Sequence, residues 1–387
     1  MEPSCTKNEP APRDLIVFGE DWGAHPSSTQ HLIRHLAPGR RVVWVNSIGL
    51  RRPKLSPADL GRAFAKLRRS VAGGGAAPAA AREPAAFPLV QPLAIPMAEG
   101  TLGRAINRVL IGRTVRAAAA AAGLRRPVVW ASLPSAVQAL GALGESAVVY
   151  YCCDDFGALA GVDHAPALRM EAELALRADL ILASSPLLAE RFEPAKTHLL
   201  PHGVDFARFA TPVPRAADMP AGGPVAGFYG TLAPWLDLGL VAAVARRLPQ
   251  WRFVLIGHPA TDLSPLDGLA NVALPGARPH AALPAYAQHW TAGIIPFVDN
   301  AQIRASNPLK LREYLAAGRP VVSTPFPALL PYRALVAEAT SVEGFAAALE
   351  ATLADPPGAA AARRDAVAEE SWAARAADAA KLIDALP

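Results

Sequence analysis

The residues with the clearest chemical potential lie in the segment NPLKLREYLAAGRPVVSTP, residues 307–325. Proline is well tolerated in the first turn of a helix, and glycine commonly follows the last turn. Pro308 and Gly318 therefore predict a helix between them. Lys310 and Glu313 are three residues apart and would share one face of that helix. An ordinary solvated ion pair has the same spacing, so the wider context must decide what the pair does.

A helix N-terminus beside a lysine is a favourable place for a diphosphate, because backbone N–H groups and the helix dipole both attract an anion. A glutamate one turn further along can accept hydrogen bonds from both hydroxyls of a ribose. The segment therefore predicts a nucleotide-binding helix in which Lys310 faces the diphosphate and Glu313 faces the ribose.

The elements that must position this helix are visible as short apolar runs alternating with helical patterns along the whole chain. Strands of parallel sheets are covered on both faces and therefore read as continuous apolar runs. Their alternation with helices is typical of doubly wound α/β units. The predicted strands are 14–19, 41–46, 127–131, 147–152, 179–184 and 198–201, then 224–230, 252–257, 271–274, 292–297 and 319–323.

The chain is long enough for two domains, and the strand pattern starts afresh near residue 224, after a proline- and glycine-rich passage. We therefore predict an α/β fold of two Rossmann-like domains facing each other across a cleft, with ligands beyond the carboxyl ends of the strands. Residues 71–98 read as a mobile loop. The predicted parts are a flexible leader 1–13, a first domain 14–210, a linker 211–223, a second domain 224–365 and a C-terminal helix 366–387 that crosses back to the first domain.

Composition restricts the classes of function. The hydrophobic content of 52% indicates folded layers, and no run reaches 18 apolar residues, so no membrane-spanning helix is predicted. The polar leader lacks the apolar core of a signal peptide, which favours a cytoplasmic protein. Cys5, Cys152 and Cys153 give neither a disulfide framework nor metal-binding spacing. We predict no metal site and expect Cys152 and Cys153 to pack at a strand end.

Two basic stretches stand out although the net charge is only +5. Residues 51–70 hold seven Lys or Arg against one Asp, and residues 104–126 hold six Arg and no acid. Both look helical, with apolar residues such as Ile106 and Val109 on one side. They fit contact with an anionic membrane at the inner face of the plasma membrane, or simply a solvated helix face, and both interpretations stay open. Nucleic acid is not expected as a partner, because aromatic residues are not interleaved with these charges.

Seven further segments, together with the helix predicted between Pro308 and Gly318, resemble a known family. In their order and spacing the chain resembles glycosyltransferases of the GT-B fold, and more narrowly the bacterial group 1-like enzymes of teichuronic-acid and exopolysaccharide synthesis. The segments are YYCCDDF (150–156), ELALRADLILASSPLLAERF (173–192), LLPHGVDFARF (199–209), GFYGTLAPWLD (227–237), VLIGHP (254–259), NVALPGARPHAALPAY (271–286) and IIPF (294–297).

The resemblance implies a donor site in the second domain for a UDP- or GDP-linked sugar, which is a substrate, with no separate cofactor. The matching residues are Gly230 and Thr231 in the turn that approaches the diphosphate, Gly276 and Arg278 beside the base, and Asn307, Leu309, Lys310 and Glu313 on the donor helix.

The acceptor would face the loop EDWGAHPSSTQHL, residues 20–32, which follows the first predicted strand. An inverting transfer needs a general base, whereas a retaining transfer does not, and the sequence leaves the stereochemistry open. The catalytic candidates are Lys310, Asp21 and His25, and the acceptor-side candidates are Trp22, Gln30, Asp154 and Asp155. Asp154 and Asp155 lack the spacing of a metal-binding DxD pair, and strand-end capping is the competing interpretation for them.

The expected activity is transfer of a sugar from a nucleotide-sugar donor to a lipid-linked or saccharide acceptor in cell-surface polysaccharide synthesis. Two departures from the family keep alternatives open. Ala305 stands where many retaining members carry a glutamate, and TLAPWLD (231–237) lacks the usual Arg and Lys. The alternatives are another nucleotide-sugar enzyme on this fold, such as an epimerase, and a non-catalytic binding protein.

Overall fold

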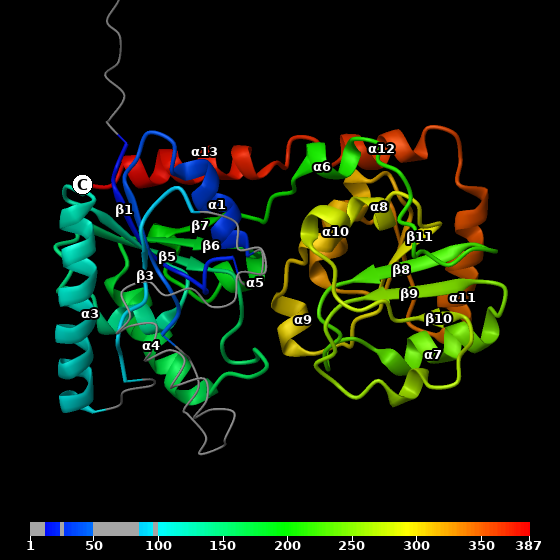
Figure 1. Cartoon of the computed structure of the whole chain (residues 1–387), viewed down its shortest axis with the longest axis horizontal. Coiled ribbons are helices and arrows are strands. Elements are labelled where there is room, and N and C mark those ends of the chain that lie inside the picture. The colour runs from blue at the N-terminus through cyan, green and yellow to red at the C-terminus, as the bar shows by residue number, and fades with distance from the viewer. Residues whose placement is uncertain (1–11, 24–26, 49–84, 96–99) are drawn as a thin grey trace, which may run out of the picture. The chain divides into compact units, whose positions relative to one another are not determined.

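The computed structural model describes residues 12–23, 27–48, 85–95 and 100–387 (Figure 1). The chain divides into two compact units. Unit 1 comprises Met1–Pro201 together with Arg375–Pro387, and unit 2 comprises His202–Ala374. Each unit is built around one parallel sheet, so the α/β class predicted from the alternating pattern is confirmed.

Unit 1 contains a seven-stranded sheet in the order β3-β2-β1-β4-β5-β6-β7, and every pairing is parallel. All six strands predicted for the first half of the chain are present. The strands are β1 (Leu15–Phe18), β2 (Val42–Val45), β3 (Leu89–Val90), β4 (Val128–Ala131), β5 (Ala147–Cys152), β6 (Leu180–Ala183) and β7 (Thr197–Leu199).

One part of the stretch 71–98, expected to be a mobile loop, is instead the edge strand β3. Its residues Leu89 and Val90 pair with Trp44 and Val45 of β2. The amide of Trp44 donates to the carbonyl of Pro88 at 3.0 Å. A strand of two residues, between Pro88 and Pro92, is too short to show a period in the sequence. It is recognised only by its pairing with β2.

The helices of unit 1 lie on both sides of its sheet: in Figure 1, α1 and α13 lie above the strands and α4 lies below. The carboxylate of Asp384 in α13 accepts hydrogen bonds from the Arg40 guanidinium at 2.5 Å and the Arg13 amide at 3.0 Å. The end of the chain is thereby fixed to unit 1. The helices are α1 (Ser28–Leu36), α3 (Thr101–Ala121), α4 (His164–Arg177), α5 (Pro186–Ala189) and α13 (Trp372–Asp384), with 3₁₀ turns η1 (Pro134–Gln138) and η2 (Pro194–Lys196).

Unit 2 contains a six-stranded parallel sheet in the order β10-β9-β8-β11-β12-β13. Its five predicted strands are present, and β13 is an additional short edge strand. The strands are β8 (Val225–Tyr229), β9 (Arg252–Ile256), β10 (Val272–Ala273), β11 (Ala292–Ile295), β12 (Val321–Ser323) and β13 (Val336–Glu338).

Helices also cover both sides of this second sheet: α8 and α10 lie above β8 and β9 in Figure 1, and α7 lies below. Trp251, Trp290, Tyr314 and Phe228 are among its fully buried side chains. The helices are α6 (Phe206–Ala210), α7 (Leu238–Arg247), α8 (Pro284–Ala287), α9 (Ala301–Ala305), α10 (Leu309–Ala316), α11 (Val342–Ala351) and α12 (Ala359–Asp365), with 3₁₀ turns η3 (Ser264–Leu266), η4 (His280–Ala282), η5 (Pro327–Tyr332) and η6 (Thr352–Ala354).

The C-terminal helix predicted for 366–387 begins later than expected, at Trp372. The preceding residues are held extended, because the Val204 amide donates to the carbonyl of Glu370 at 2.8 Å and the Trp372 amide donates to the carbonyl of Val204 at 3.3 Å. Gly203 lies so close to this strand-like passage that a Cβ there would be 2.7 Å from the Trp372 nitrogen. Residues 370–372 pair with Val204, which is far away in the sequence, so no periodic pattern in the sequence predicts this extended passage.

Beside this passage, Glu370 neutralises the buried Arg312 of α10. The guanidinium of Arg312, a residue that is 4% exposed, donates to Glu370 Oε2 at 2.5 Å and to Asn307 Oδ1 at 2.6 Å. The Tyr332 hydroxyl donates to the same Glu370 oxygen at 2.6 Å. These hydrogen bonds link residues 370–372 to the start of α10.

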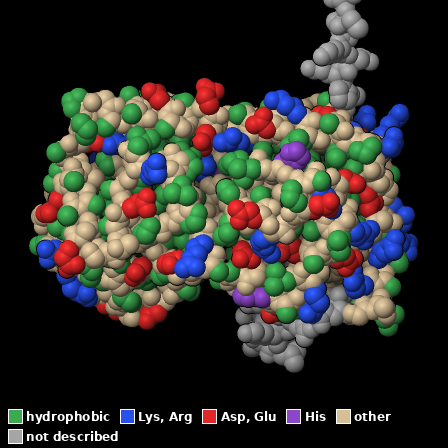
Figure 2. Space-filling view, turned by 180° about the vertical axis from the view of Figure 1, so that it is seen from behind, with side chains coloured by type: hydrophobic (Ala, Val, Ile, Leu, Met, Phe, Trp, Pro, Cys, Tyr) green, Lys and Arg blue, Asp and Glu red, His purple; other side chains and the backbone are tan. Residues whose placement is uncertain are grey.

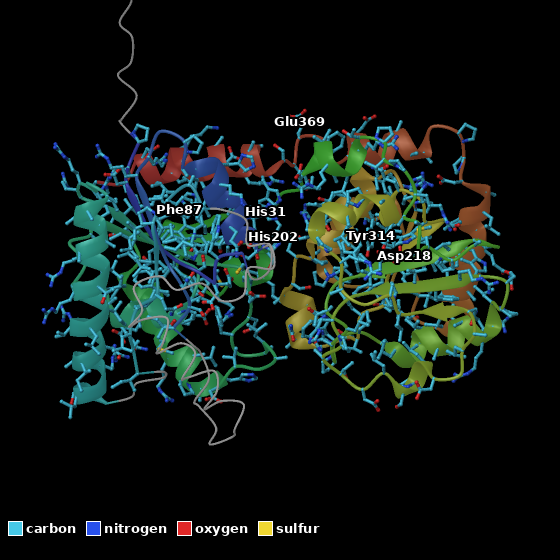
Figure 3. The ribbon with its side chains drawn as sticks, in the orientation of Figure 1. His31, Phe87, His202, Asp218, Tyr314 and Glu369 are labelled. Carbon is cyan, nitrogen blue, oxygen red and sulfur yellow. The ribbon has the colours of Figure 1, made fainter. Side chains whose placement is uncertain are left out.

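We expect Glu370→Ala to lower the free energy of unfolding by about 3 kcal/mol, because it leaves a buried guanidinium without its carboxylate. Urea denaturation measures this change. The neighbouring Glu369, labelled in Figure 3, is exposed, so Glu369→Ala is the matched control and should change little. Equal losses in the two variants would contradict the assignment.

Candidate functional site

The sheet of unit 2 reverses its winding between β8 and β11. These strands are hydrogen-bonded neighbours, yet the chain continues outward from β8 to β9 and from β11 to β12. In open parallel sheets such a switch point leaves room for a ligand beyond the carboxyl ends of the two strands. Gly230 and Thr231 follow β8, Pro296 and Phe297 follow β11, and α10 brings the predicted donor residues to the same place.

Lys310 lies at this switch point. Its Nζ is 5.2 Å from the ring centroid of Phe228, on β8, and 5.2 Å from that of Phe297, just beyond β11. Ring faces attract a cation, but among the described residues no group forms a hydrogen bond to this ammonium. Burial lowers the pKa of Lys310 to about 8, and the nearby charge of Glu313 only partly opposes that effect. The site therefore holds a half-buried positive charge to which no protein group among the described residues is hydrogen-bonded.

The turn after β8 is glycine for a steric reason. Gly230 has a φ of +135°, and a Cβ there would lie 3.3 Å from Lys310 Cε and 3.4 Å from its Nζ. A Cβ on Gly257, at the end of β9, would lie 1.8 Å from the carbonyl oxygen of Gly230. A side chain at Gly230 would crowd the ammonium of Lys310. The backbone can thus approach an anion closely here, while Thr231 is exposed beside it.

Glu313 already has hydrogen-bond partners on both carboxylate oxygens. The Tyr229 hydroxyl donates to Oε2 at 2.6 Å, and His280 Nε2 lies 2.8 Å from Oε1. An Arg208 guanidinium nitrogen lies 3.3 Å from His280 Nδ1 and can only donate, so Nδ1 accepts and Nε2 carries the proton that Glu313 accepts. Each carboxylate oxygen can accept a second hydrogen bond. Ribose binding by Glu313 stays a prediction, and Tyr229 and His280 would fix the orientation of the carboxylate.

Arg278 and Gly276 lie in the loop that leads to His280. The Arg278 guanidinium donates to the Tyr286 hydroxyl at 3.0 Å and to Asp218 at 2.6 Å. Hydrogen bonds from Tyr286 and Arg278 hold the pKa of Asp218, labelled in Figure 3, below its usual value. Gly276 has a φ of +78°, the left-handed region that glycine adopts without strain. These contacts of Arg278 hold the loop itself, and its contact with a nucleotide base stays a prediction.

The start of α10 is fixed from two directions. Asn307 accepts from Arg312 through its side chain, and its carbonyl oxygen lies 2.6 Å from His202 Nδ1, which donates. Burial lowers the pKa of His202 to about 4, so this histidine is neutral near pH 7. Leu309, the first helical residue, is half-buried, and Ala305 is buried at the end of α9. Helix α10 begins at Leu309 and ends at Ala316, so the helix predicted between Pro308 and Gly318 is confirmed.

In unit 1 the predicted acceptor-side residues of the first loop have internal roles. Asp21 Oδ1 accepts hydrogen bonds from the Ser47 amide at 3.1 Å and its hydroxyl at 2.8 Å. Trp22 is buried and packs edge-on against Trp44, with ring centroids 4.8 Å apart. Gln30 is buried, and its Oε1 accepts from the Gly23 amide at 3.3 Å. His25 lies outside the described residues. Direct contact of Asp21, Trp22 or Gln30 with an acceptor stays a prediction.

Besides Asp21, three carboxyl groups follow β1 and β5. Asp155 accepts from Arg191 at 3.1 Å and from the Gly157 amide at 2.9 Å, which is the capping geometry of a strand end. Burial raises the pKa of Asp154, whose Oδ2 is 3.4 Å from the Cys153 sulfur. Burial also raises the pKa of Glu20, and the charge of Asp154 adds to that effect. Glu20 was not among the sequence candidates, since its burial depends on packing around the loop.

Comparison with known proteins supports the fold. Residues 223–355 match the family model described as Glycosyl transferases group 1. HepE of Anabaena, solved in complex with UDP and glucose, superposes with a TM-score of 0.67 at 14% identity, over 97% of this chain and 100% of that one. Sucrose-phosphate synthase of Thermosynechococcus elongatus gives 0.68 at 17%, over 96% and 98%.

The chain has the GT-B fold. Within its second unit, residues 223–355 resemble group 1 glycosyltransferases. A teichuronic acid biosynthesis glycosyltransferase of Bacillus subtilis (strain 168), TuaH, is 32% identical over 170 residues. That match covers 41% of this chain and 43% of TuaH, so the similarity extends over less than half of the relative's length. The resemblance expected from the motifs is confirmed.

Two kinds of feature are absent from the described part of the chain. Within it, no three His, Cys, Asp or Glu side chains come together as a group that could hold a metal ion. In the same residues, no helix is both long enough and apolar enough to cross a bilayer.

Proposed function

We propose that this chain transfers a sugar from a UDP-linked donor to a lipid-linked or saccharide acceptor in the synthesis of a cell-surface polysaccharide. The observation that carries the proposal is the half-buried ammonium of Lys310, held between the rings of Phe228 and Phe297 at the β8–β11 switch point. The group 1 match over unit 2, the UDP bound in HepE, and the similarity to TuaH support the donor and the pathway class.

Glycosyl transfer builds positive charge on the sugar ring and negative charge on the departing diphosphate. In this proposal the diphosphate lies against Lys310, the N-terminal amides of α10 and the Gly230 turn, without a metal ion. Such groups are already oriented and poorly solvated, so they stabilise the developing charge without reorganisation. Glu313, held by Tyr229 and His280, binds the ribose and sets the position of the donor.

The acceptor side belongs to unit 1 in this proposal. A retaining transfer needs no enzymic base, because the leaving diphosphate can take the acceptor proton, whereas an inverting transfer needs one. Asp21 and His25 are the candidates from the sequence. Glu20 is a further candidate, because it follows β1 and burial raises its pKa, as is common for carboxyl groups at functional sites.

The first experiment is a thermal-shift screen of the full chain with UDP, GDP, CMP and dTDP and their common sugar conjugates. A ligand at about 100 times its dissociation constant stabilises by roughly 2.7 kcal/mol, a shift of a few degrees at this size. We expect UDP and UDP-sugars to give the shift, and UDP release to require an acceptor.

Three other outcomes would argue against the proposed transfer reaction. Conversion of the donor sugar without any acceptor would indicate an epimerase. A shift without turnover on any acceptor would indicate a non-catalytic binding protein, with Ala305 as the first position to restore to glutamate. No shift with any nucleotide would remove the basis of the proposal.

A further inference from the structure

A basic groove lies between α3 and α4 in unit 1. It has a volume of about 460 Å³, and Arg104, Arg108 and Arg177 contribute its guanidinium groups. Glu173 is the acidic side chain of the lining. Three guanidinium groups against one carboxylate leave a net positive charge. Figure 2 shows Lys and Arg side chains gathered along the edge of unit 1 that carries α3, at the right of the view.

Arg108 and Arg177 converge on one point of the backbone, at Gly141. A Cβ on Gly141 would lie 3.0 Å from an Arg108 guanidinium nitrogen and 3.2 Å from one of Arg177, so both nitrogens are close to the same point. Like charges held this close repel each other, and an anion between them would replace repulsion by attraction. A phosphate group has several acceptor oxygens and can accept hydrogen bonds from both guanidinium groups at once.

The acidic side chains beside these arginines have their own partners. Glu173 forms its close ion pair with Arg104, and its carboxylate is 3.9 Å from Arg177. Glu145 accepts a hydrogen bond from the Gly141 amide, and within the described residues it forms no ion pair with an arginine. Neither carboxylate therefore occupies the space between the two converging guanidinium groups.

Hydrogen-bond donors for a ligand remain at this point of the groove. Arg108 donates to the Gly141 carbonyl at 3.0 Å, and Arg177 donates no hydrogen bond to a described residue. Each guanidinium group has five N–H donors, so most of them are left for an acceptor. Thr101, the first residue of α3, lines the same groove, and the first turn of this helix has no acidic side chain. The unpaired amides of that turn add to the positive potential of the arginines.

We propose that the groove between α3 and α4 binds a small soluble molecule through a phosphate monoester. The arginines supply charge-assisted hydrogen bonds to the phosphate, and a volume of about 460 Å³ is in the range of small-molecule sites. The exposed apolar side chains of α3 lie on the face of the helix turned away from the groove: Leu102, Ile106 and Val109. A bilayer seated on the groove would gain no contact with them, which favours a soluble ligand over a lipid headgroup. The site does not depend on the proposed transfer reaction.

The test is titration calorimetry of the full chain with glycerol 3-phosphate, with glycerol and with sodium chloride of equal ionic strength as the ligand controls. We expect glycerol 3-phosphate and inorganic phosphate to bind and glycerol not to bind. The double change Arg108→Gln with Arg177→Gln should weaken binding of both phosphates at least about tenfold, the effect of losing charge-assisted hydrogen bonds. The matched control is Arg246→Gln with Arg247→Gln, two exposed arginines in the last turn of α7, and it should leave binding unchanged.

Two further measurements separate the groove from the candidate donor site and from a structural role. Lys310→Met removes the charge of the donor site, and phosphate binding to the groove should persist in that variant. Loss of phosphate binding there would place the anion at the donor site and overturn the proposal. Without ligand, the double arginine variant should melt no lower than the unchanged chain, because two like charges are removed. An equal drop in melting temperature with and without phosphate would show that the arginines are structural.

Vesicles of phosphatidic acid and phosphatidylcholine distinguish a lipid phosphate from a soluble one. We expect glycerol 3-phosphate to bind equally well with and without these vesicles, because the exposed apolar residues of α3 face away from the groove. Co-sedimentation with the vesicles that glycerol 3-phosphate reverses, and that the double arginine variant abolishes, would assign the groove to a lipid headgroup and overturn the soluble ligand. Absence of binding by both glycerol 3-phosphate and inorganic phosphate at millimolar concentration would overturn the site itself.

Discussion

Lys310→Met is expected to lower kcat/KM for the UDP-sugar by at least about 100-fold, the effect of removing one charge-stabilising donor from a poorly solvated active site. The fold should survive, because methionine fills the space between Phe228 and Phe297 without a charge to desolvate. Steady-state kinetics and thermal denaturation measure the two effects. We expect activity to collapse while the melting temperature stays equal or rises.

The control for this variant is Lys381→Met on α13, where the lysine side chain is 77% exposed and pairs with Asp378 at 3.3 Å. It should change neither activity nor melting temperature appreciably. If Lys310→Met instead lost stability and activity in parallel, Lys310 would be a structural residue of unit 2. The assignment of the diphosphate position would then be wrong.

The pKa of Lys310 adds a pH dependence with a defined sign. In the ligand-free protein this pKa is about 8, and a bound diphosphate favours the charged lysine. UDP affinity should therefore be constant below pH 8 and fall above it, by up to about tenfold per pH unit. Titration calorimetry between pH 7 and 9.5 tests this. Lys310→Met should bind weakly at every pH, and a persisting slope in that variant would assign the titration to another group.

The strands and the ends of the donor helix could be predicted because their signals are local. Apolar runs mark β8 and β11, and Pro308 and Gly318 mark the limits of α10. The edge strands β3 and β13, with two and three residues, were not predicted, because their pairing comes from neighbours distant in the sequence. The same limitation applies to the C-terminal passage that pairs with Val204.

The candidate site was predictable in its residues but not in its contacts. Lys310 and Glu313 follow from helical spacing, whereas the partners of Glu313 lie 84 and 33 residues away in the chain. The residue types in the segment EDWG, residues 20–23, did not show which side chains are structural and which could take part in the reaction. Trp22 became a core ring and Asp21 a partner of Ser47, while burial altered the pKa of Glu20. Side-chain type suggests chemistry, but only packing decides which polar group is left to perform it.

The contacts of Glu313 give the last prediction, which concerns the ribose alone. Glu313→Gln should weaken UDP binding about tenfold to a hundredfold, the range for lost hydrogen bonds to a charged group. Binding of 2′,3′-dideoxy-UDP should change little, since that nucleotide lacks the hydroxyls that the carboxylate would accept from. The amide oxygen can still accept from the Tyr229 hydroxyl, but the amide nitrogen then faces His280 Nε2, so thermal denaturation must show that the fold is retained.

His280→Gln should act in the same direction with a smaller loss, because it removes the group that orients Glu313 and not the acceptor itself. The control is His289→Gln, whose ring nitrogen lies 2.8 Å from the carbonyl oxygen of Val213, away from this carboxylate. Calorimetry with both nucleotides on all three variants completes the comparison. If Glu313→Gln and His280→Gln weakened UDP and the dideoxy nucleotide equally, the pair would only support α10. A loss confined to the nucleotide with hydroxyls would place the ribose at Glu313, because only a direct contact can distinguish two ligands that differ there alone.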